Sequence, residues 1–398
     1  MLSLLMKKVR MGMVGGGQNA FIGGIHRIAA FIDGEIELVC GAFSSNEARS
    51  KASGLSLYLP ENRCYGSYDE MFKSEALLPK AERMEFVVIV TPNHLHLPIA
   101  KTAIESGFHV LSDKPATLNL SGALALENLI KQHNCLYGLT HTYNGYPLVK
   151  QAKHLIAQGD LGNIVKIVVE YSQGWLASKD DEKSKQASWR LDPEKSGVSG
   201  CMGDIGVHAA NLVEYVSGLH ITDVCADLTS TVAGRSLDDD GTVMLKLSNG
   251  AKGVLLASQI SLGDENNLKL RIYGDKKSIE WSQLEPNTLW LKSNTQATQQ
   301  IRAGVGDMCL EAQRAMRTPA GHPEGYLEAF ANIYQNFVAQ VRAHNNGEKS
   351  DNATFDVPGI EEAVRGMAFI ENVVIASQSD LKWHPYTLDI NQNFLEQT

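Results

Sequence analysis

A glycine triplet, Gly15-Gly16-Gly17, directly follows a short apolar run and constrains the fold of this chain more than any other feature. The run Val9 to Gly15 (VRMGMVG) predicts a buried strand, and a helix is expected from about Ile25 to Ile32. Glycine permits the positive φ angles of a tight turn, and its missing Cβ lets the backbone approach a pyrophosphate. The following helix presents free N–H groups and its positive dipole end to that anion. We therefore expect Gly15, Gly17 and Gln18 to contact a dinucleotide.

The spacing of these glycines departs from the minimal GxGxxG fingerprint. The third glycine would fall at position 20, which is Ala20, and the next glycines are Gly23 and Gly24. The loop is therefore expected to be about three residues longer than the minimal fingerprint. For the triplet alone, a plain structural turn is the alternative. The strand before it and the alternating strands and helices after it favour the dinucleotide.

The second predicted strand, Leu38 to Phe43, ends without a carboxylate. An NAD-specific Rossmann protein usually has Asp or Glu there to accept from the ribose 2′-hydroxyl. Here Ser44 and Ser45 follow, no carboxylate would repel a 2′-phosphate, and Arg49 and Lys51 are close enough in sequence to pair with one. We expect Ser44, Ser45 and Arg49 at the adenosine ribose, with NAD or NADP as cofactor and a tilt towards NADP. Alternatively, Ser44 caps the next helix.

The first third of the chain alternates strands and helices in the way a parallel sheet requires. Further strands are expected at Glu85–Thr91, His109–Ser112 and Leu136–Thr140, with helices at 46–53, 98–106 and 120–133. The sequence therefore predicts a doubly wound Rossmann domain over residues 1–143.

The pattern changes after this domain. We expect a helix at 146–158, a strand at 164–171, a polar segment at 178–203 and a short helix at 207–217. Five strands are expected next, at 224–232, 242–247, 253–258, 268–273 and 278–281. Two helices, at 325–344 and 360–377, follow them. Short, closely spaced strands favour antiparallel pairing. Residues 144–398 are therefore predicted to form an α+β domain, with a large, mostly antiparallel sheet and helices on one face, for substrate binding and oligomerisation.

Charge and cysteine usage exclude several kinds of partner. The 36 Lys and Arg are scattered among 45 Asp and Glu, so we expect no nucleic acid. No stretch approaches the roughly 18 apolar residues of a membrane-spanning helix, so we expect no membrane association. The six cysteines form no CxxC pair and no cluster has metal-ligand spacing. We expect free thiols, no metal and a cytoplasmic location.

Three further motifs narrow the interpretation to a family. They are Thr91-Pro92-Asn93-His94-Leu95-His96, Asp113-Lys114-Pro115 and Gly203-Asp204-Ile205-Gly206-Val207-His208. In this order and spacing the chain resembles the Gfo/Idh/MocA family of sugar and cyclitol dehydrogenases, over nearly its whole length. The segment Gly321-His322-Pro323-Glu324-Gly325-Tyr326 resembles the sugar- and inositol-oxidising members.

The resemblance implies a catalytic lysine and a set of cofactor contacts. In the family a lysine in an E-K-P motif lies near the nicotinamide and the reacting hydroxyl, which makes it Lys114 here; Asp113 replaces the usual Glu. Pro115 fits a rigid turn, often with a cis bond in relatives. Thr91, Asn93, His96, Asp113 and Lys114 are the expected cofactor contacts of this region. An exposed loop lysine is the alternative for Lys114.

Asp204 and His208 are four residues apart and would share one face of a helix. A carboxylate one turn from an imidazole fixes its tautomer and raises its basicity, as a general base needs. We expect His208 and Lys114 to handle the hydroxyl proton together, with Asp204 in support. The family motif continues with Asp where this chain has Asn211, which we expect to orient substrate by a hydrogen bond. The alternative is a helix cap at Asp204 and a packed His208.

Supporting positions come from several segments. His141, Tyr143, Asn144, His322 and Tyr326 are expected on the substrate side, together with Lys114, Asp204, His208 and Asn211. Trp189-Arg190 resembles a pair that reaches the nicotinamide from the second domain in relatives. Surface or packing roles are the alternative for each of them.

The leading functional prediction is an NAD(P)-dependent dehydrogenase that oxidises a secondary hydroxyl of a sugar, sugar derivative or cyclitol. Polar residues around the expected pocket suit a polyol. One alternative is a lyase or glycoside hydrolase that uses bound NAD transiently with no net redox change; another is a non-catalytic NAD-binding sensor. The apolar strands of the second domain also predict a homodimer or homotetramer.

Overall fold

The computed structural model describes residues 7–183, 185–352 and 354–388, and the chain forms two compact units. The first unit comprises the residues up to Thr117, Gly122–Thr142 and Leu327–Ala363. The second comprises Leu118–Ser121, Tyr143–Tyr326 and the residues from Val364. The chain passes from the first unit to the second between Thr142 and Tyr143, and the 327–363 segment clusters with the N-terminal sheet.

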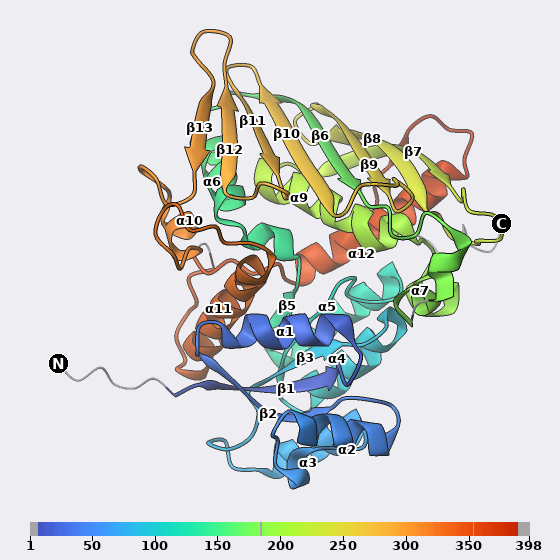
Figure 1. The fold of residues 1–398 in the computed structure, drawn as a ribbon, viewed down its shortest axis with the longest axis vertical. Coiled ribbons are helices and arrows are strands. Elements are labelled where there is room, and N and C mark those ends of the chain that lie inside the picture. Colours follow the sequence, from blue (N-terminus) through green and yellow to red (C-terminus); the bar gives the residue numbers. More distant parts are fainter. Residues whose placement is uncertain (1–6, 184, 353, 389–398) are drawn as a thin grey trace. The chain divides into compact units, whose positions relative to one another are not determined.

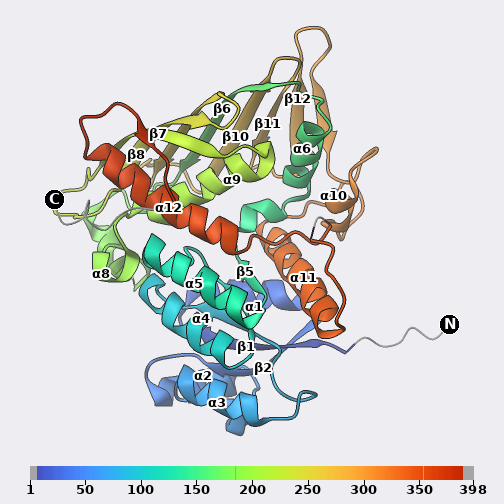
Figure 2. The same cartoon turned by 180° about the vertical axis from the view of Figure 1, so that it is seen from behind.

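The first unit is built on a parallel sheet of five described strands in the order β2-β1-β3-β4-β5. Its strands are β1 (Val9–Gly15), β2 (Ile36–Ala42), β3 (Phe86–Val90), β4 (His109–Ser112) and β5 (Tyr137–Leu139). Its helices are α1 (Phe21–Phe31), α2 (Glu47–Ser56), α3 (Tyr68–Leu77), α4 (His96–Glu105), α5 (Leu120–His133) and α11 (Tyr326–Asn345). Helices cover both faces of the sheet (Figures 1 and 2), which confirms the doubly wound prediction.

The central strand β3 explains why this sheet needs two covered faces. All five of its residues are buried, and a parallel strand in mid-sheet contacts helices on both sides. Phe86 meets Phe337 of α11 edge to face, with ring centroids 5.5 Å apart. On the same helix, the Tyr334 hydroxyl lies 2.6 Å from Nδ1 of His26 in α1. These contacts account for the grouping of α11 with the N-terminal sheet.

The second unit is built on a sheet of nine described strands in the order β13-β12-β11-β10-β6-β9-β8-β7-β14. Its strands are β6 (Ile164–Ser172), β7 (Ile221–Thr229), β8 (Asp240–Leu247), β9 (Lys252–Ser258), β10 (Asn267–Gly274), β11 (Ser278–Ser282), β12 (Thr288–Lys292), β13 (Gln299–Arg302) and β14 (His384–Pro385). Every pair is antiparallel except β6 with β9, which confirms the mostly antiparallel prediction.

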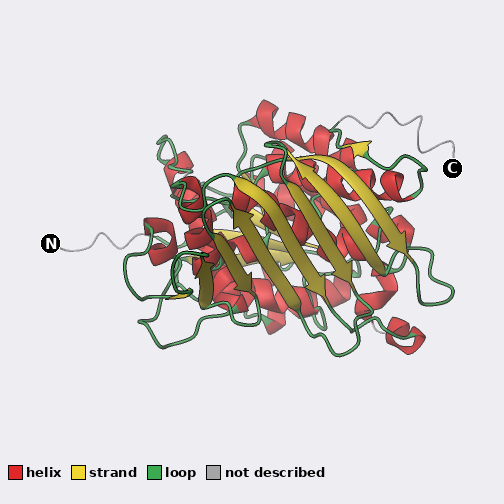
Figure 3. Cartoon of the chain, turned by 90° about the horizontal axis from the view of Figure 1, so that it is seen from above, coloured by secondary structure: helices red, strands yellow, loops and turns green. Residues whose placement is uncertain are grey.

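One face of this sheet carries helices. In Figure 3 the strands face the viewer and helices lie behind them. The helices that the second unit contributes are α6 (Pro147–Ala157), α7 (Lys185–Arg190), α8 (Pro193–Ser196), α9 (Val207–Ser217), α10 (Leu310–Arg314) and most of α12 (Ile360–Ser377). Strand β8 shows why the helices lie on one face only. Its apolar residues Val243, Leu245 and Leu247 are buried on that face, while Thr242 and Met244 on the other face are exposed. None of the helices in the described ranges is long and apolar enough to cross a membrane.

Candidate functional site

The glycine turn between β1 and α1 leaves no room for side chains. Gly15 and Gly16 have φ angles of 85° and 69°, which favour glycine. A Cβ on Gly15 would lie 2.7 Å from the carbonyl oxygen of Val90, and one on Gly17 would lie 2.7 Å from that of Phe43. Arg27 fixes the turn by donating from Nη1 to the Gly16 carbonyl at 2.7 Å. This backbone cradle has the form that a pyrophosphate requires.

The helix after the turn begins earlier than predicted, while the third glycine stands three residues later than in the minimal fingerprint, as expected. Helix α1 begins at Phe21 instead of Ile25, so Gly23 falls within its first turn and takes the place of the third glycine. A Cβ on Gly23 would lie 2.3 Å from Cα of Gly16. The N-cap residue, Ala20, makes no side-chain cap bond, and the first turn of the helix has no acidic residue. The first N–H groups of α1 are therefore suited to an anion.

The loop after β2 leaves a basic residue exposed near the expected ribose position. Asn46 caps α2 by accepting from the Arg49 N–H at 3.0 Å, so the predicted alternative of a Ser44 cap is wrong. The Ser44 hydroxyl accepts from the Asn46 N–H at 3.2 Å, and Ser45 is exposed. Lys51 is paired with Glu47 at 2.7 Å. Arg49 is exposed, and its role at a 2′-phosphate stays a prediction.

The loop after β3 carries buried polar atoms. Thr91 Oγ1 and His94 Nδ1 are buried and have no hydrogen-bond partner in the part of the chain that the structure describes. Asn93 is 6% exposed and lies in the same short helical turn as His94. Buried polar atoms are normally satisfied, so this loop fits a polar ligand. The cradle and these atoms together fit a dinucleotide.

His96 links this loop to the turn that carries Lys114. It is 1% exposed, with Nδ1 2.7 Å from the Pro115 carbonyl and Nε2 2.8 Å from the Thr91 carbonyl. Both ring nitrogens face backbone carbonyls, and the predicted contact of His96 with the cofactor stays a prediction. Burial lowers the pKa of His96, against the opposing charge of Asp113 and the two carbonyls. A neutral imidazole has one N–H and donates to one carbonyl at a time. His96 therefore positions both loops.

The structure brings Asp113, Lys114 and His141 together at the ends of β4 and β5. The Asp113 Oδ1 accepts from the Lys114 N–H and from the Thr140 hydroxyl, both at 2.9 Å. The Lys114–Pro115 bond is cis, as the resemblance implied. Burial, followed by the charge of Lys114, lowers the pKa of His141 to about 3. His141 is therefore neutral, which suits a hydrogen-bonding role and not an acid role.

In the second unit, Asp204 lies in a π-helical turn, Met202–Gly206, immediately before α9. The wider turn changes the α-helical alignment that the spacing of Asp204 and His208 predicted. Asp204 Oδ2 accepts from Nε2 of Gln259 at 2.9 Å and forms an ion pair with Nε of Arg190 at 3.3 Å. Arg190 in turn stacks on Trp189, with its guanidinium carbon 4.4 Å from the ring centroid. Asp204 thus joins the predicted Trp189–Arg190 pair to the helix of His208.

His208 is 8% exposed and packs on an aromatic support. Tyr143 meets it edge to face, with ring centroids 5.0 Å apart. The hydroxyls of Tyr143 and Tyr171 are hydrogen-bonded to each other; Tyr171 also donates to Asn266 Oδ1 at 2.7 Å, and Asn266 Nδ2 donates to the Tyr143 hydroxyl at 3.2 Å. Burial raises the pKa of both tyrosines. The closed ring of bonds occupies the Tyr143 hydroxyl, so Tyr143 supports His208, and its predicted substrate contact stays a prediction.

Sequence reasoning missed Tyr171, Asn266 and Gln259. Gln259 directly follows β9 and Asn266 directly precedes β10, and neither belongs to a sequence motif. Tyr171 is on the inward face of β6, where period-two alternation predicts only a core residue. The alternation of buried positions could have predicted that Tyr171 packs beneath α9, but not that its hydroxyl bonds to Tyr143 and Asn266.

The remaining predicted residues lie in two places. Asn144 donates from Nδ2 to Asn211 Oδ1 at 2.8 Å, so these two predicted substrate residues do meet. His322 is exposed, and its Nδ1 lies 3.1 Å from the Pro319 carbonyl. Glu324 organises that loop by accepting from the N–H groups of Arg317 and Thr318. Tyr326 lies close enough to Tyr171 that its charge would raise the pKa of Tyr171.

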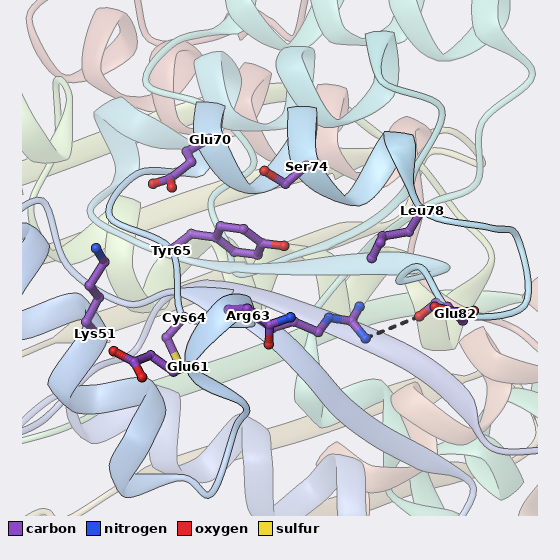
Figure 4. Close-up of a pocket in the computed structure, with 10 residues that line it drawn as sticks. Lys51, Glu61, Arg63, Cys64, Tyr65, Glu70, Ser74, Leu78 and Glu82 are labelled. Atoms are coloured by element: carbon purple, nitrogen blue, oxygen red, sulfur yellow. Dashed lines mark hydrogen bonds between the residues drawn. The ribbon is translucent and has the colours of Figure 1, made fainter.

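A hollow of about 430 Å³ lies elsewhere on the first unit, beside α2 and α3 (Figure 4). Its arginine is used within the protein: Arg63 binds buried Glu75 through Nε and Nη2 and donates to the Glu82 carbonyl at 3.3 Å. Of the residues considered for the cofactor or the substrate, Lys51 alone lines it. The hollow is therefore not the candidate site.

Comparison with known proteins agrees with the geometry of both units. Residues 9–141 match the model of the oxidoreductase family with an NAD-binding Rossmann fold, and residues 149–280 match the GFO/IDH/MocA C-terminal domain. YfiI, an uncharacterized oxidoreductase of Bacillus subtilis, is 32% identical over 96% of this chain and 97% of its own.

Solved structures extend the likeness to the whole fold. An inositol dehydrogenase homolog from Azotobacter vinelandii, solved with NAD+, has a TM-score of 0.91 at 32% identity, covering 96% of this chain and 98% of its own. An oxidoreductase from Sinorhizobium meliloti has a TM-score of 0.86 at 40% identity, covering 95% of this chain and 99% of its own. This chain therefore belongs to the Gfo/Idh/MocA family and is an NAD(P)-dependent oxidoreductase acting on CH–OH groups.

Proposed function

We propose that this protein oxidises a secondary hydroxyl of a cyclic polyol, a cyclitol or sugar, by hydride transfer to nicotinamide. The observation that carries the proposal is the anchored Asp113-Lys114-Pro115 turn, held by Thr140 and His96 at the carboxyl ends of the parallel strands. Ligands of open α/β sheets bind at that edge. The A. vinelandii homolog, 31% identical over 96% of this chain, was also solved with NADH and myo-inositol, which supports a cyclitol as first candidate.

The reaction needs one hydride acceptor and one proton acceptor. Bound NAD(P)+ would supply the hydride acceptor at its nicotinamide ring. The carbinol carbon loses a hydride, the hydroxyl loses a proton, and a carbonyl forms. Among the chain's residues we assign proton removal to His208 together with Lys114, because the raised pKa of buried Tyr143 and Tyr171 keeps both protonated.

The other polar groups orient the substrate or the catalytic residues. Asp204, paired with Arg190 and Gln259, holds the π-helical turn that leads into α9. Neutral His141 lies beside Lys114, and its imidazole suits a hydrogen bond to a substrate hydroxyl. Asn211, held by Asn144, offers its amide to a substrate hydroxyl. Polyols need several such convergent partners, since each hydroxyl left unpaired lowers affinity.

We further propose that the protein accepts NADP at least as well as NAD. The support is the exposed Arg49 and the absence of a carboxylate at the end of β2, in Ala42-Phe43-Ser44-Ser45. Arg49→Glu should lower kcat/KM with NADP and leave kcat/KM with NAD nearly unchanged. Equal losses with both cofactors would contradict this assignment.

The test of the reaction is a panel of cyclitols and sugars, run with NAD and NADP while cofactor reduction is followed. His208→Asn should lower turnover by at least about 100-fold, the typical contribution of a general base. The matched control is His220→Asn, because His220 is a largely exposed histidine of the same unit. Full turnover in His208→Asn would refute the assignment of the base.

We also propose a homodimer or homotetramer that uses the outer face of the nine-stranded sheet, with a second copy as its partner. Val165 is 51% exposed and Met244 38% exposed on that sheet, an arrangement that favours burial against another apolar surface. Light scattering at micromolar concentration tests this, and a monomer would contradict it. A cytoplasmic location is proposed as well, because all six cysteines are free thiols.

A further inference from the structure

Three potential metal ligands meet on the second unit, away from any motif of the sequence. The ligand atoms of His154, Cys309 and Glu311 all lie within 4.8 Å of one another. His154 lies in the last turn of α6, Cys309 immediately precedes α10, and Glu311 lies in the first turn of α10. Sequence spacing could not show this cluster, because His154 and Cys309 are far apart in the chain. The expectation of no metal rested on spacing alone.

The backbone around the cluster is held in place by hydrogen bonds of its own. Gln151, one turn before His154, accepts from the Cys309 N–H at 2.8 Å and is 5% exposed. Gln313 donates from Nε2 to the Met308 carbonyl at 2.6 Å. The start of α10 is therefore fixed against α6 before any ion arrives. A preformed backbone reduces the ordering that metal binding would require.

The set of donors is specific in its chemistry. A thiolate, an imidazole and a carboxylate suit Zn2+, whereas Mg2+ and Ca2+ prefer oxygen ligands alone. Bond lengths of about 2.0–2.3 Å place the ligands of a tetrahedral zinc roughly 3.5 Å apart. Side-chain rotations that move the ligand atoms of the three residues by roughly 1 Å would bring them to this spacing. His154 and Glu311 are partly exposed, so both have room to rotate and solvent can reach a fourth position.

The thiolate form of cysteine is the metal ligand, so binding displaces the proton of Cys309. An arriving cation replaces that proton, which passes to solvent: Cys–SH and Zn2+ give a zinc–sulfur bond and one H+. Binding of this kind is tighter at higher pH.

We propose that His154, Cys309 and Glu311 bind one Zn2+ per chain, with water as the fourth ligand. The ion would link α10 to α6 and stabilise the second unit, because it binds the folded chain and not the separated segments. The proposal is independent of the reaction proposed above, since neither helix contributes a residue assigned to proton transfer.

The test uses the full-length chain, reduced, treated with chelator, desalted and titrated with Co2+ and then Zn2+. We expect one Co2+ per chain, a thiolate-to-cobalt charge-transfer band in the near ultraviolet, loss of that band on adding Zn2+, and a rise in Tm with Zn2+. Cys309→Ser should abolish the band and weaken Zn2+ binding by at least about tenfold. His154→Asn should also weaken binding. Cys225→Ser, which alters a partly exposed thiol of the same unit outside the cluster, should leave the band intact.

Three results would overturn the site. The first is an absence of Co2+ binding at micromolar concentration, and the second is binding without a charge-transfer band. The third is a band that survives in Cys309→Ser. Far-ultraviolet circular dichroism of each variant shows that it is folded, and activity of the purified enzyme does not enter the interpretation.

Discussion

The contact between Gly23 and Gly16 gives a sharp prediction about cofactor binding. In Gly23→Ala the new Cβ would lie 2.3 Å from Cα and 2.7 Å from the carbonyl oxygen of Gly16. Carbon atoms pack at about 3.5–4.0 Å, so the turn or the helix must move by more than 1 Å. Both contacts are with backbone, which no side-chain rotation relieves. The displaced groups are those of the pyrophosphate cradle.

The expected cost follows from this overlap. Overpacking of this kind costs about 1–3 kcal/mol, and if the strain is relieved by displacing the cradle, the Kd for cofactor rises by about 5- to 150-fold. The neighbouring Gly24 provides a matched control, because its Cβ would meet nothing within 4 Å. Gly24→Ala should leave cofactor binding unchanged and stabilise α1 by up to about 1 kcal/mol.

The assay is a calorimetric or fluorescence titration of each variant with NADH and NADPH, alongside urea unfolding. Gly23→Ala should lose affinity for both cofactors, since the pyrophosphate is common to them, while Gly24→Ala binds as the parent does. Equal Kd values for the two variants would refute the assignment of this turn as the pyrophosphate site.

Three further predictions concern the loops and the core of the first unit. His96→Leu removes the donor to a buried carbonyl, which costs about 1–3 kcal/mol of stability; if that displaces Lys114, kcat falls by about 5- to 150-fold with a smaller change in KM. The control His133→Leu, at an exposed histidine, should be neutral. An unchanged kcat in folded His96→Leu would contradict the role of His96 in positioning the Lys114 turn. Burial, followed by the charges of His344 and Arg83, lowers the pKa of His109 to about 4 from 6.5. Between these pH values the unfolded chain binds a proton at His109 that the folded chain does not, so the free energy of unfolding falls as pH falls, by about 1.4 kcal/mol per pH unit from this group. Urea unfolding at several pH values should show a shallower pH dependence of that free energy in His109→Asn than in the parent protein. An equal pH dependence in the two proteins would contradict the lowered pKa of His109. Arg63→Ala leaves the fully buried Glu75 carboxylate without its cation and should reduce the free energy of unfolding by about 3–5 kcal/mol, with partial recovery in Arg63→Ala/Glu75→Gln; a loss below about 1 kcal/mol in urea unfolding would contradict the burial of this pair.

Much of the fold could be predicted because its signals are local. The buried run of β3 and the period of α5 each lie within one stretch of sequence, and the predicted bounds of β4, α5, α9 and α12 agree with the structure. Strands β12 and β13 and helix α3 were missed. Alternation is short in β12 and β13, and α3 has only a weak apolar face, with Met71 and Phe72 buried. Such elements form because of the sheet or core that they join.

The candidate site was predictable where a motif carries it and not where partners come from elsewhere. Gly15, Lys114 and Asp204 could be named from motifs, but the positioning role of His96 depends on its hydrogen bonds to two carbonyls from separate loops. The ring of bonds at Tyr143 joins segments more than a hundred residues apart. Long-range contacts of this kind leave no periodic trace, so a residue's type was predictable while its partner was not.

A polyol deuterated at the carbinol carbon tests net dehydrogenation by hydride transfer. We expect each carbonyl product formed to be matched by one reduced cofactor, with the deuterium on the nicotinamide ring. Product formation with no accumulated reduced cofactor would contradict net dehydrogenation and favour a lyase or glycoside hydrolase. Cofactor binding with no turnover across the panel would contradict the enzyme altogether.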